Sequence, residues 1–258
     1  MDFAATIRTG FTRWQASGLH LLISAIIAAA VLTVMLGVWY PRPLFEAQGG
    51  MGLVFILVGV DVVIGPLITL VIFKSGKPGL KFDLAVIAAL QLAALIYGGT
   101  VVFAARPVFL VLVKDQFEVV TAAELHPKWL EEARRPEFRA LPVSGPVLVM
   151  LEQPGDETER QAIIQSALAG ERDAQHFTKY YVPYPERARA ALSNALPVET
   201  VRRRYVETAR VIDAYLASSG RKDTDVRYFA MRTRYEWIAV LVDARTGDIV
   251  NMLLVPDS

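Results

Sequence analysis

Residues that could carry out catalysis are few in this sequence and are not grouped. Three histidines lie far apart and show none of the spacings typical of metal ligands: His20, His126 and His176. The chain contains no cysteine, which excludes disulfides, thiol catalysis and cysteine zinc sites. It has no nucleophile elbow, Walker loop or dinucleotide-binding fingerprint. The sequence therefore predicts a protein that is not an enzyme and that binds neither a metal nor a cofactor.

Two charged clusters could indicate other functions. Asp223-Thr224-Asp225 matches the Asp-x-Asp pattern of metal-dependent sugar transferases, but a chain with twelve aspartates often contains that pattern by chance. A solvated loop before a strand is the simpler interpretation. Arg202-Arg203-Arg204 falls on the polar face of an expected helix, where a solvated surface explains it better than a docking patch.

The most informative polar residue, Asp61, lies inside an apolar segment. It is about 12 residues, or roughly 18 Å, from the expected cytoplasmic end of that segment, near the middle of a bilayer. A charged side chain at this depth costs about 2.5–3.5 kcal/mol. We therefore expect Asp61 to face protein or to stay protonated.

Small residues beside Asp61 suggest a close contact between two helices. Four-residue spacing places two sets of residues on facing stripes: Asp61, Gly65 and Thr69 on one helix, and Ala85, Ala89, Ala93 and Tyr97 on the next. An antiparallel arrangement then predicts a hydrogen bond between Asp61 and the Tyr97 phenol. Pro66 frees the main-chain carbonyl of Val62 for another partner. The candidates for interaction within the membrane are Asp61, Gly65, Pro66, Gln91 and Tyr97. Two roles stay open for Asp61: packing alone, or contact with a partner helix or movement of a proton.

Three apolar stretches are long enough to cross a bilayer as helices: 19–38, 51–73 and 84–104. The first is longer than the apolar core of a usual signal peptide, and Trp39-Tyr40 follows it like an interfacial belt, so we expect it to be retained. The segment before the first stretch and the loop 74–83 carry more Lys and Arg than the loop 39–50, which contains only Arg42. The positive-inside rule thus predicts a cytoplasmic N-terminus and a domain outside after Arg106.

The remaining sequence has the composition of a soluble domain. Strands are expected at 107–113, 117–120, 147–151, 226–233, 237–242 and 249–255, and helices at 121–134, 157–168 and 196–216. We expect three transmembrane α-helices followed by an α+β domain with an antiparallel sheet. The expected divisions are a cytoplasmic segment 1–18, a three-helix membrane region 19–105 and a periplasmic domain 106–258. A formal net charge of +1 makes nucleic acid a poor candidate partner.

The membrane region also resembles a known family. The segments that carry the resemblance are Val38-Trp39-Tyr40-Pro41-Arg42-Pro43-Leu44-Phe45, Gly59-Val60-Asp61-Val62-Val63-Ile64-Gly65-Pro66-Leu67, Leu80-Lys81-Phe82-Asp83-Leu84-Ala85-Val86, Gln91-Leu92-Ala93 and Arg106-Pro107-Val108-Phe109. Together they resemble the type IV pilin accessory proteins of the TfpX/TfpZ family. The resemblance covers roughly residues 19–120 and is looser beyond them.

This resemblance implies a non-enzymatic accessory factor in the bacterial inner membrane that helps a cognate major pilin to be held, assembled or displayed. Its implied partners are that pilin, possible pilus assembly machinery and membrane lipid. Two alternatives stay open: a membrane-anchored periplasmic sensor or binding domain, and a membrane-bound transferase. The short cytoplasmic segments weaken the first alternative, and the scattered acids and histidines weaken the second.

Overall fold

The computed structural model describes residues 11–256, without the side chains of Leu53, Ile56 and Leu57. The first ten residues of the expected cytoplasmic segment therefore lie outside the described part. The chain divides into two compact units. A helical unit comprises the chain up to Val38 together with Gly50–Phe103, and a sheet unit comprises Trp39–Gly49 together with Ala104–Ser258. The loop between the first two expected spans thus packs with the sheet unit.

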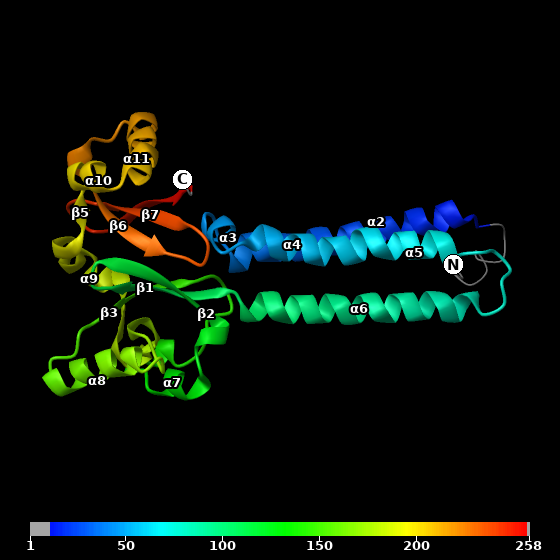
Figure 1. Ribbon diagram of the computed structural model, residues 1–258, viewed down its shortest axis with the longest axis horizontal. Coiled ribbons are helices and arrows are strands. Elements are labelled where there is room, and N and C mark those ends of the chain that lie inside the picture. The colour runs from blue at the N-terminus through cyan, green and yellow to red at the C-terminus, as the bar shows by residue number, and fades with distance from the viewer. Residues whose placement is uncertain (1–10, 257–258) are drawn as a thin grey trace. The chain divides into compact units, whose positions relative to one another are not determined.

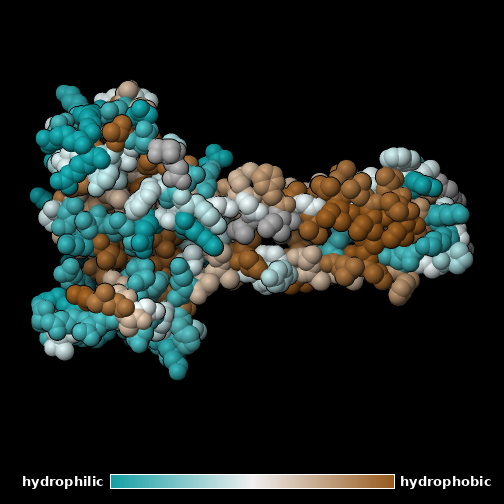
Figure 2. All heavy atoms as spheres, in the orientation of Figure 1, coloured by the Kyte–Doolittle hydropathy of each residue, from teal (hydrophilic) through white to brown (hydrophobic). Residues whose placement is uncertain are grey.

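The helical unit contains long apolar helices (Figure 1). In chain order they are α2 (Arg13–Val34) with the π-helical turn η1 (Met35–Trp39), then α4 (Gly50–Val58), the π-helical turn η2 (Gly59–Ile64), α5 (Gly65–Ile72) and α6 (Leu80–Ala104). Thr12 begins α2 with a capping box, in which its hydroxyl accepts a hydrogen bond from the Gln15 main chain at 3.2 Å. Figure 2 shows hydrophobic residues covering much of the visible surface of this unit.

Two of these helices are long and apolar enough to cross a membrane: Arg13–Trp39 and Leu80–Ala104. The expected second span is helical from residue 50 to residue 72, but a π-helical turn interrupts it, and Gly59–Ile72 counts as a shorter apolar helix. The turn ends at Ile64, two residues before Pro66, which has no main-chain N–H to donate to the carbonyl of residue 62 and whose ring crowds that carbonyl. A wider turn relieves that crowding. A third membrane crossing stays a prediction.

The sheet unit is built on one mixed sheet within the described residues. Its strands are β1 (Pro107–Val113), β2 (Gln116–Thr121), β3 (Val147–Leu151), β4 (Tyr181–Pro183), β5 (Leu196–Pro197), β6 (Val226–Arg232), β7 (Trp237–Asp243) and β8 (Ile249–Val255). Their order is β4-β3-β1-β2-β6-β7-β8, and β5 pairs with β6. The expected strands and the β7–β8 hairpin are confirmed, with Val240 opposite Met252.

The prediction of an antiparallel sheet was wrong. Strand β1 pairs in parallel with β3, and β2 pairs in parallel with β6. Long connections carrying helices separate these strands in the chain, which is what a parallel neighbour requires. Strand composition alone does not reveal the direction of the neighbouring strand.

Helices cover both sides of the sheet. They are α3 (Leu44–Ala47), α7 (Pro127–Glu131), α8 (Glu157–Leu168), α9 (Tyr184–Ala191), α10 (Val198–Arg204) and α11 (Val206–Ser219). Short 3₁₀ turns are η3 (Ala122–Glu124), η4 (Pro136–Phe138), η5 (Ala174–His176), η6 (Thr178–Tyr180), η7 (Leu192–Asn194) and η8 (Asp223–Asp225). Helix α3 belongs to the core, since Leu44 and Ala47 are buried beside Phe117 and Ile238.

Two expected helices differ from the structure. Residues 196–216 form β5, α10 and α11 rather than one helix, because Tyr205 has a non-helical conformation (φ −135°, ψ 84°) that interrupts the helix. The break lets Val201 and Ile212 join one core cluster, while Tyr205 stays 46% exposed. Residues 121–134 form only η3 and α7, because Pro127 holds the preceding residue in an extended conformation.

Candidate functional site

Polar side chains join α2 to α5 inside the helical unit. The Ser17 hydroxyl donates to the Pro66 carbonyl at 2.9 Å, and His20 Nδ1 lies 2.7 Å from the Thr69 hydroxyl. Thr69 is buried, with 2% of its surface exposed. Because neighbouring helices are as apolar as lipid, such hydrogen bonds help to fix which faces of the helices meet. They place His20 on the face of α2 that packs against the Thr69 face of α5.

Asp61 lies in η2 and is 8% exposed. Its Oδ1 atom is buried and has no hydrogen-bond partner among the described residues. Gln91 from α6 donates to the main-chain carbonyl of Asp61 at 3.2 Å and leaves this oxygen unsatisfied. A buried acceptor without a donor is costly, so a ligand or partner that supplied a donor here would gain affinity.

Gly65 leaves room for the end of the Gln91 side chain, which reaches it from α6. A Cβ atom at this position would lie 2.0 Å from Gln91 Nε2, far inside contact distance. Absence of a side chain therefore lets the Gln91 amide reach η2. Three of the predicted residues are brought together at this contact, namely Asp61, Gly65 and Gln91, whereas the Pro66 carbonyl contacts Ser17 of α2.

The predicted hydrogen bond between Asp61 and Tyr97 was wrong, because Tyr97 is 73% exposed. Gln91 and Tyr97 are six residues apart on α6, which places them about 120° apart around the helix axis. Since Gln91 faces η2, Tyr97 points elsewhere. Four-residue spacing indicates the depth of a residue along the helix, but packing against η2 sets the rotation of α6 about its axis.

A cavity of about 560 Å³ opens beside these groups, between α2, the η2–α5 segment and α6. Its polar lining residues are His20, Ser24, Asp61, Thr69 and Gln91. Its apolar lining comes mainly from α2 and α6: Ala16, Leu19, Ile23, Ile27, Leu84, Ile87, Ala88, Leu92 and Leu95. This combination suits an apolar partner that carries a hydrogen-bond donor.

Sequence reasoning did not identify the contribution of the first helix. Ser17, His20 and Ser24 follow one another at spacings of three and four, which places them on one face of α2. That spacing is visible in the sequence and could have indicated a polar helix contact. The sequence analysis considered His20 only as a metal ligand, for which it has no partner histidine at a suitable spacing. Its part in a hydrogen-bonded helix contact was therefore missed.

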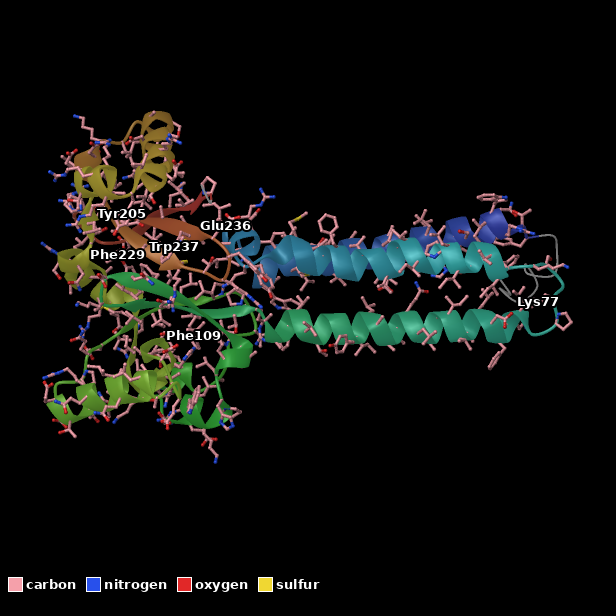
Figure 3. The ribbon with its side chains drawn as sticks, viewed as in Figure 1. Lys77, Phe109, Tyr205, Phe229, Glu236 and Trp237 are labelled. Carbon is pink, nitrogen blue, oxygen red and sulfur yellow. The ribbon has the colours of Figure 1, made fainter. Side chains whose placement is uncertain are left out.

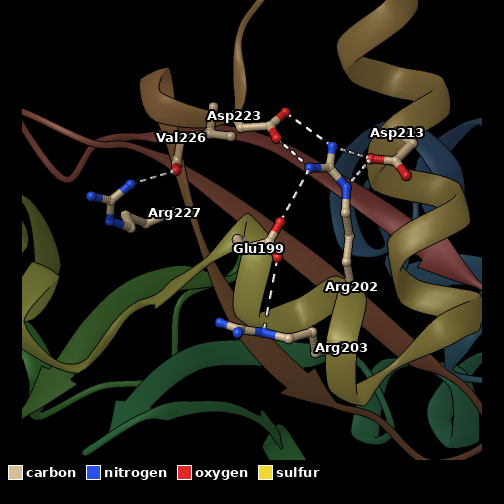
Figure 4. Close-up of polar contacts among 7 residues, drawn as sticks. All are labelled: Glu199, Arg202, Arg203, Asp213, Asp223, Val226 and Arg227. Carbon is tan, nitrogen blue, oxygen red and sulfur yellow. Dashed lines mark hydrogen bonds and ion pairs between the residues drawn. The ribbon is translucent and has the colours of Figure 1, made fainter.

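The charged clusters of the sheet unit form internal contacts (Figure 4). Arg202 donates to Asp213 at 2.7 Å and also binds Asp223, so α10, α11 and η8 are joined. Hydrogen bonds from Arg202 hold the pKa of Asp223 below its usual range. Asp225 accepts from the Lys222 main chain at 2.9 Å. Within residues 11–256 no group of three or more His, Asp or Glu could hold a metal ion.

A second, smaller cavity of about 240 Å³ lies in the sheet unit. Trp129 and His176 stack there with ring centroids 6.2 Å apart. The guanidinium of Arg172 lies 4.7 Å from the Trp129 ring centroid and pairs with Glu132 at 2.8 Å. Burial lowers the pKa of His176, although Glu124 and Asp173 act in the opposite direction.

Comparison with known proteins identifies the family. The family model described as "Fimbrial assembly protein FimB" matches residues 8–49. The "Fimbrial assembly protein, serogroup I" of Dichelobacter nodosus is 34% identical over 165 residues, which are 63% of this chain and 63% of that protein. The serogroup E1 protein of the same organism is 33% identical with the same coverage. The chain thus spans slightly less than two thirds of the length of these two relatives.

A third relative is covered more completely. The "Fimbrial assembly protein, serogroups C1 and C2" of Dichelobacter nodosus is 35% identical over 112 residues, which are 42% of this chain and 85% of that protein. No solved structure matches the chain. The identity and the coverage of this relative show that the chain belongs to the fimbrial assembly protein family.

Proposed function

We propose that this protein is a non-enzymatic accessory factor for type IV pilus biogenesis, of the TfpX/TfpZ type, that assists assembly or display of a cognate major pilin. Membership of the fimbrial assembly family carries the proposal. The absence of a metal-binding group among the described residues is compatible with a binding role. Partners are the major pilin and the pilus assembly machinery.

The proposed location is the bacterial inner membrane, with the N-terminus in the cytoplasm and the sheet unit in the periplasm. Two apolar helices of membrane length support a membrane location. The interrupted helix from residue 50 to residue 72 supplies the third crossing that this orientation needs. In this orientation Lys74, Lys77 and Lys81 are cytoplasmic.

The cavity at Asp61 is the proposed contact for the membrane segment of the pilin. Its lining is mostly apolar, as a membrane-embedded partner requires, and Asp61 Oδ1 can accept a hydrogen bond that the described residues do not supply. Such a contact would hold a pilin without a chemical step. Asp61 and Gln91 line this contact and Gly65 leaves room for Gln91, whereas Pro66 and Tyr97 are not among the lining residues.

A deletion strain tests the function. Loss of this protein should reduce surface pili made from the cognate pilin, leave pilin synthesis intact and change pili made from an unrelated pilin little. Equal loss of both kinds of pilus would indicate a general component of the machinery, and no loss would contradict the proposal.

Complementation with two matched variants tests the cavity. Ala88 lines it and the neighbouring Ala89 does not, although both are exposed on α6. Ala88→Phe fills the cavity and should fail to restore pili, while Ala89→Phe should restore them. Equal restoration by both variants, at equal protein abundance, would show that the pilin does not use this cavity.

Cysteine labelling tests the orientation, since the chain has no native cysteine. A cysteine replacing the exposed Ser218 should react with an impermeant thiol reagent in intact spheroplasts, and one replacing Ser75 should not. The opposite pattern would show that the proposed orientation is inverted.

A further inference from the structure

We propose that the turn between β6 and β7 is a lipid-binding surface that rests on the outer leaflet of the inner membrane. The surface consists of Arg234, Tyr235 and Trp237, here called the turn patch, and the segment that the turn packs on carries the exposed Arg42. This inference rests on the proposal that the helical unit spans the membrane. It adds a binding site for lipid headgroups in the sheet unit.

Main-chain contacts fix the turn to the segment 39–49. The Ala47 carbonyl accepts hydrogen bonds from the Tyr235 main chain at 3.2 Å and from the Thr233 hydroxyl at 2.9 Å. A Cβ atom at Gly49, whose φ is +74°, would lie 2.4 Å from the Tyr235 ring. The Tyr235 ring therefore packs directly on the Gly49 main chain, and the turn cannot separate from this segment without losing these contacts.

Chain connectivity limits how far this contact is from the bilayer. The π-helical turn η1 ends at Trp39 and α4 begins at Gly50, so both ends of the segment continue into the apolar helices. Three peptide units separate Ala47 from Gly50, which keeps their Cα atoms within about 11 Å of each other. The headgroup region of one leaflet is roughly 5–8 Å thick. A turn bonded to Ala47 is consequently within reach of the headgroups.

The side chains of the turn patch have the chemistry of a membrane interface. Tyr235 is 58% exposed and Trp237 is 44% exposed, and such rings favour the headgroup level because they combine an apolar body with a polar atom. The Arg234 guanidinium is 5.4 Å from the Tyr235 ring centroid. The Arg42 side chain is 82% exposed, with Glu46 3.6 Å away.

A lipid phosphate is the occupant that fits this group best. Arginine donates to phosphate oxygens with matched geometry, and a cation near the membrane surface is attracted to anionic headgroups. Exposed rings beside such a cation would enter the interface at the same depth. Figure 3 shows the neighbouring Glu236 and Trp237 on this part of the sheet unit.

Fluorescent labelling of the full chain in nanodiscs that contain phosphatidylglycerol tests the inference. An environment-sensitive dye is attached to a single cysteine at Tyr235 or, as the matched control, at Tyr205, which is 46% exposed at the break between α10 and α11. The dye at 235 should be quenched by headgroup-labelled lipid and protected from aqueous iodide. The dye at 205 should be accessible to iodide and should not be quenched by headgroup-labelled lipid. This control shows that quenching at 235 does not come from an affinity of the dye itself for lipid.

A third position separates failure of this inference from failure of the proposed membrane location. Leu90 is 67% exposed on α6, and a dye there should be quenched by lipid labelled deep in the acyl chain. Quenching at 90 together with equal iodide access at 235 and 205 would contradict lipid binding by the turn patch and leave the membrane location of the helical unit intact. Absence of quenching at 90 would overturn both the membrane location and the turn patch.

Two matched arginine variants test whether Arg234 contributes to lipid binding. Arg234→Gln, added to the labelled 235 variant, should reduce quenching by anionic headgroup-labelled lipid. Arg203→Gln on α10, whose side chain is 71% exposed, should leave it unchanged. Equal quenching in both variants would show that Arg234 does not bind the headgroups.

Discussion

Asp61 combines deep burial with an unsatisfied carboxylate oxygen, and two substitutions can distinguish its possible roles. Asp61→Asn keeps the size of the side chain but removes its charge and its ability to titrate, whereas Asp61→Leu also removes hydrogen bonding. Hydrogen bonds between membrane helices average about 0.6 kcal/mol, so a packing role predicts a mild defect for Leu and almost none for Asn. A partner or proton role predicts equal loss of pili in both variants.

Counts of surface pili at matched protein abundance decide this prediction. Under the proposed function we expect Asp61→Asn to fail as badly as Asp61→Leu, because a hydrogen bond to an ionised carboxylate is roughly twice as strong as one to the neutral amide oxygen that Asn provides. Tyr97→Phe is the control and should be neutral, because the Tyr97 side chain is exposed away from Asp61. Normal piliation with Asp61→Asn would leave Asp61 as a packing residue.

His176 should make the stability of the sheet unit depend on pH. Burial lowers its pKa, so the unfolded chain binds a proton more tightly than the folded chain does. The stability that comes from keeping His176 neutral is present above its ordinary pKa of about 6.5 and is lost as the pH falls through and below that value. The change can reach at most about 1.4 kcal/mol per pH unit for one proton.

The measurement is the free energy of unfolding of the detergent-solubilised protein at pH 7 and pH 5, followed by tryptophan fluorescence. His176→Phe should keep a ring against Trp129 but lose less stability on acidification than the parent chain. Identical pH dependence in the two proteins would mean that His176 does not contribute to acid destabilisation.

At the scale of elements, the contact between η2 and α6 depends on the absence of a side chain at Gly65. Gly65→Ala would place Cβ 2.0 Å from Gln91 Nε2, so the end of the Gln91 side chain would have to move and weaken its hydrogen bond to the Asp61 carbonyl, at a cost of about 0.5–1.5 kcal/mol. The double variant Gly65→Ala with Gln91→Ala removes the clash and should recover part of the lost stability. Thermal unfolding in detergent provides the comparison.

A second glycine provides the control for this prediction. A Cβ atom added to Gly52 on α4 would have nothing within 4 Å among the described residues, so Gly52→Ala should cost little. If the double variant were as unstable as Gly65→Ala alone, the Gly65–Gln91 contact would not explain the loss. The π-helical turn η2 also belongs to this contact, because it carries Asp61 and ends at Ile64, directly before Gly65.

At the scale of the whole molecule, the short segment 39–49 is a structural part of the sheet unit. Leu44 is 1% exposed and packs in the core cluster that includes Phe117 and Ile238. Leu44→Ala should therefore destabilise the sheet unit by about 2–5 kcal/mol. Leu168→Ala on α8 is the matched control, because Leu168 is 83% exposed.

Resistance of the sheet unit to limited proteolysis in the full-length protein measures this effect. We expect faster cleavage within residues 107–255 for Leu44→Ala and an unchanged rate for Leu168→Ala. Equal rates would mean that the segment 39–49 is not needed for stability of the sheet. Burial of Tyr40 in the same segment, which raises the pKa of Tyr40 to about 12, agrees with its place in the core.

The sequence by itself determined the local elements whose patterns are strong. Apolar runs of membrane length indicated α2 and α6, and alternating β-branched residues with a late glycine indicated the β7–β8 hairpin. It also identified Asp61, because a charge within an apolar run is rare enough to stand out. These features depend on residues close together in the chain, so they can be recognised without knowing the fold.

Tertiary structure decided everything that depends on how distant elements meet. Strand direction followed from long connections, so the sheet is mixed. Rotation of α6 placed Gln91, and not Tyr97, beside η2. Docking of the segment 39–49 into the sheet core followed from contacts to residues far along the chain, such as that between Ala47 and Thr233, 186 positions apart. The physical reason is common to all three: packing between elements sets rotation and direction, which local sequence periodicity leaves free.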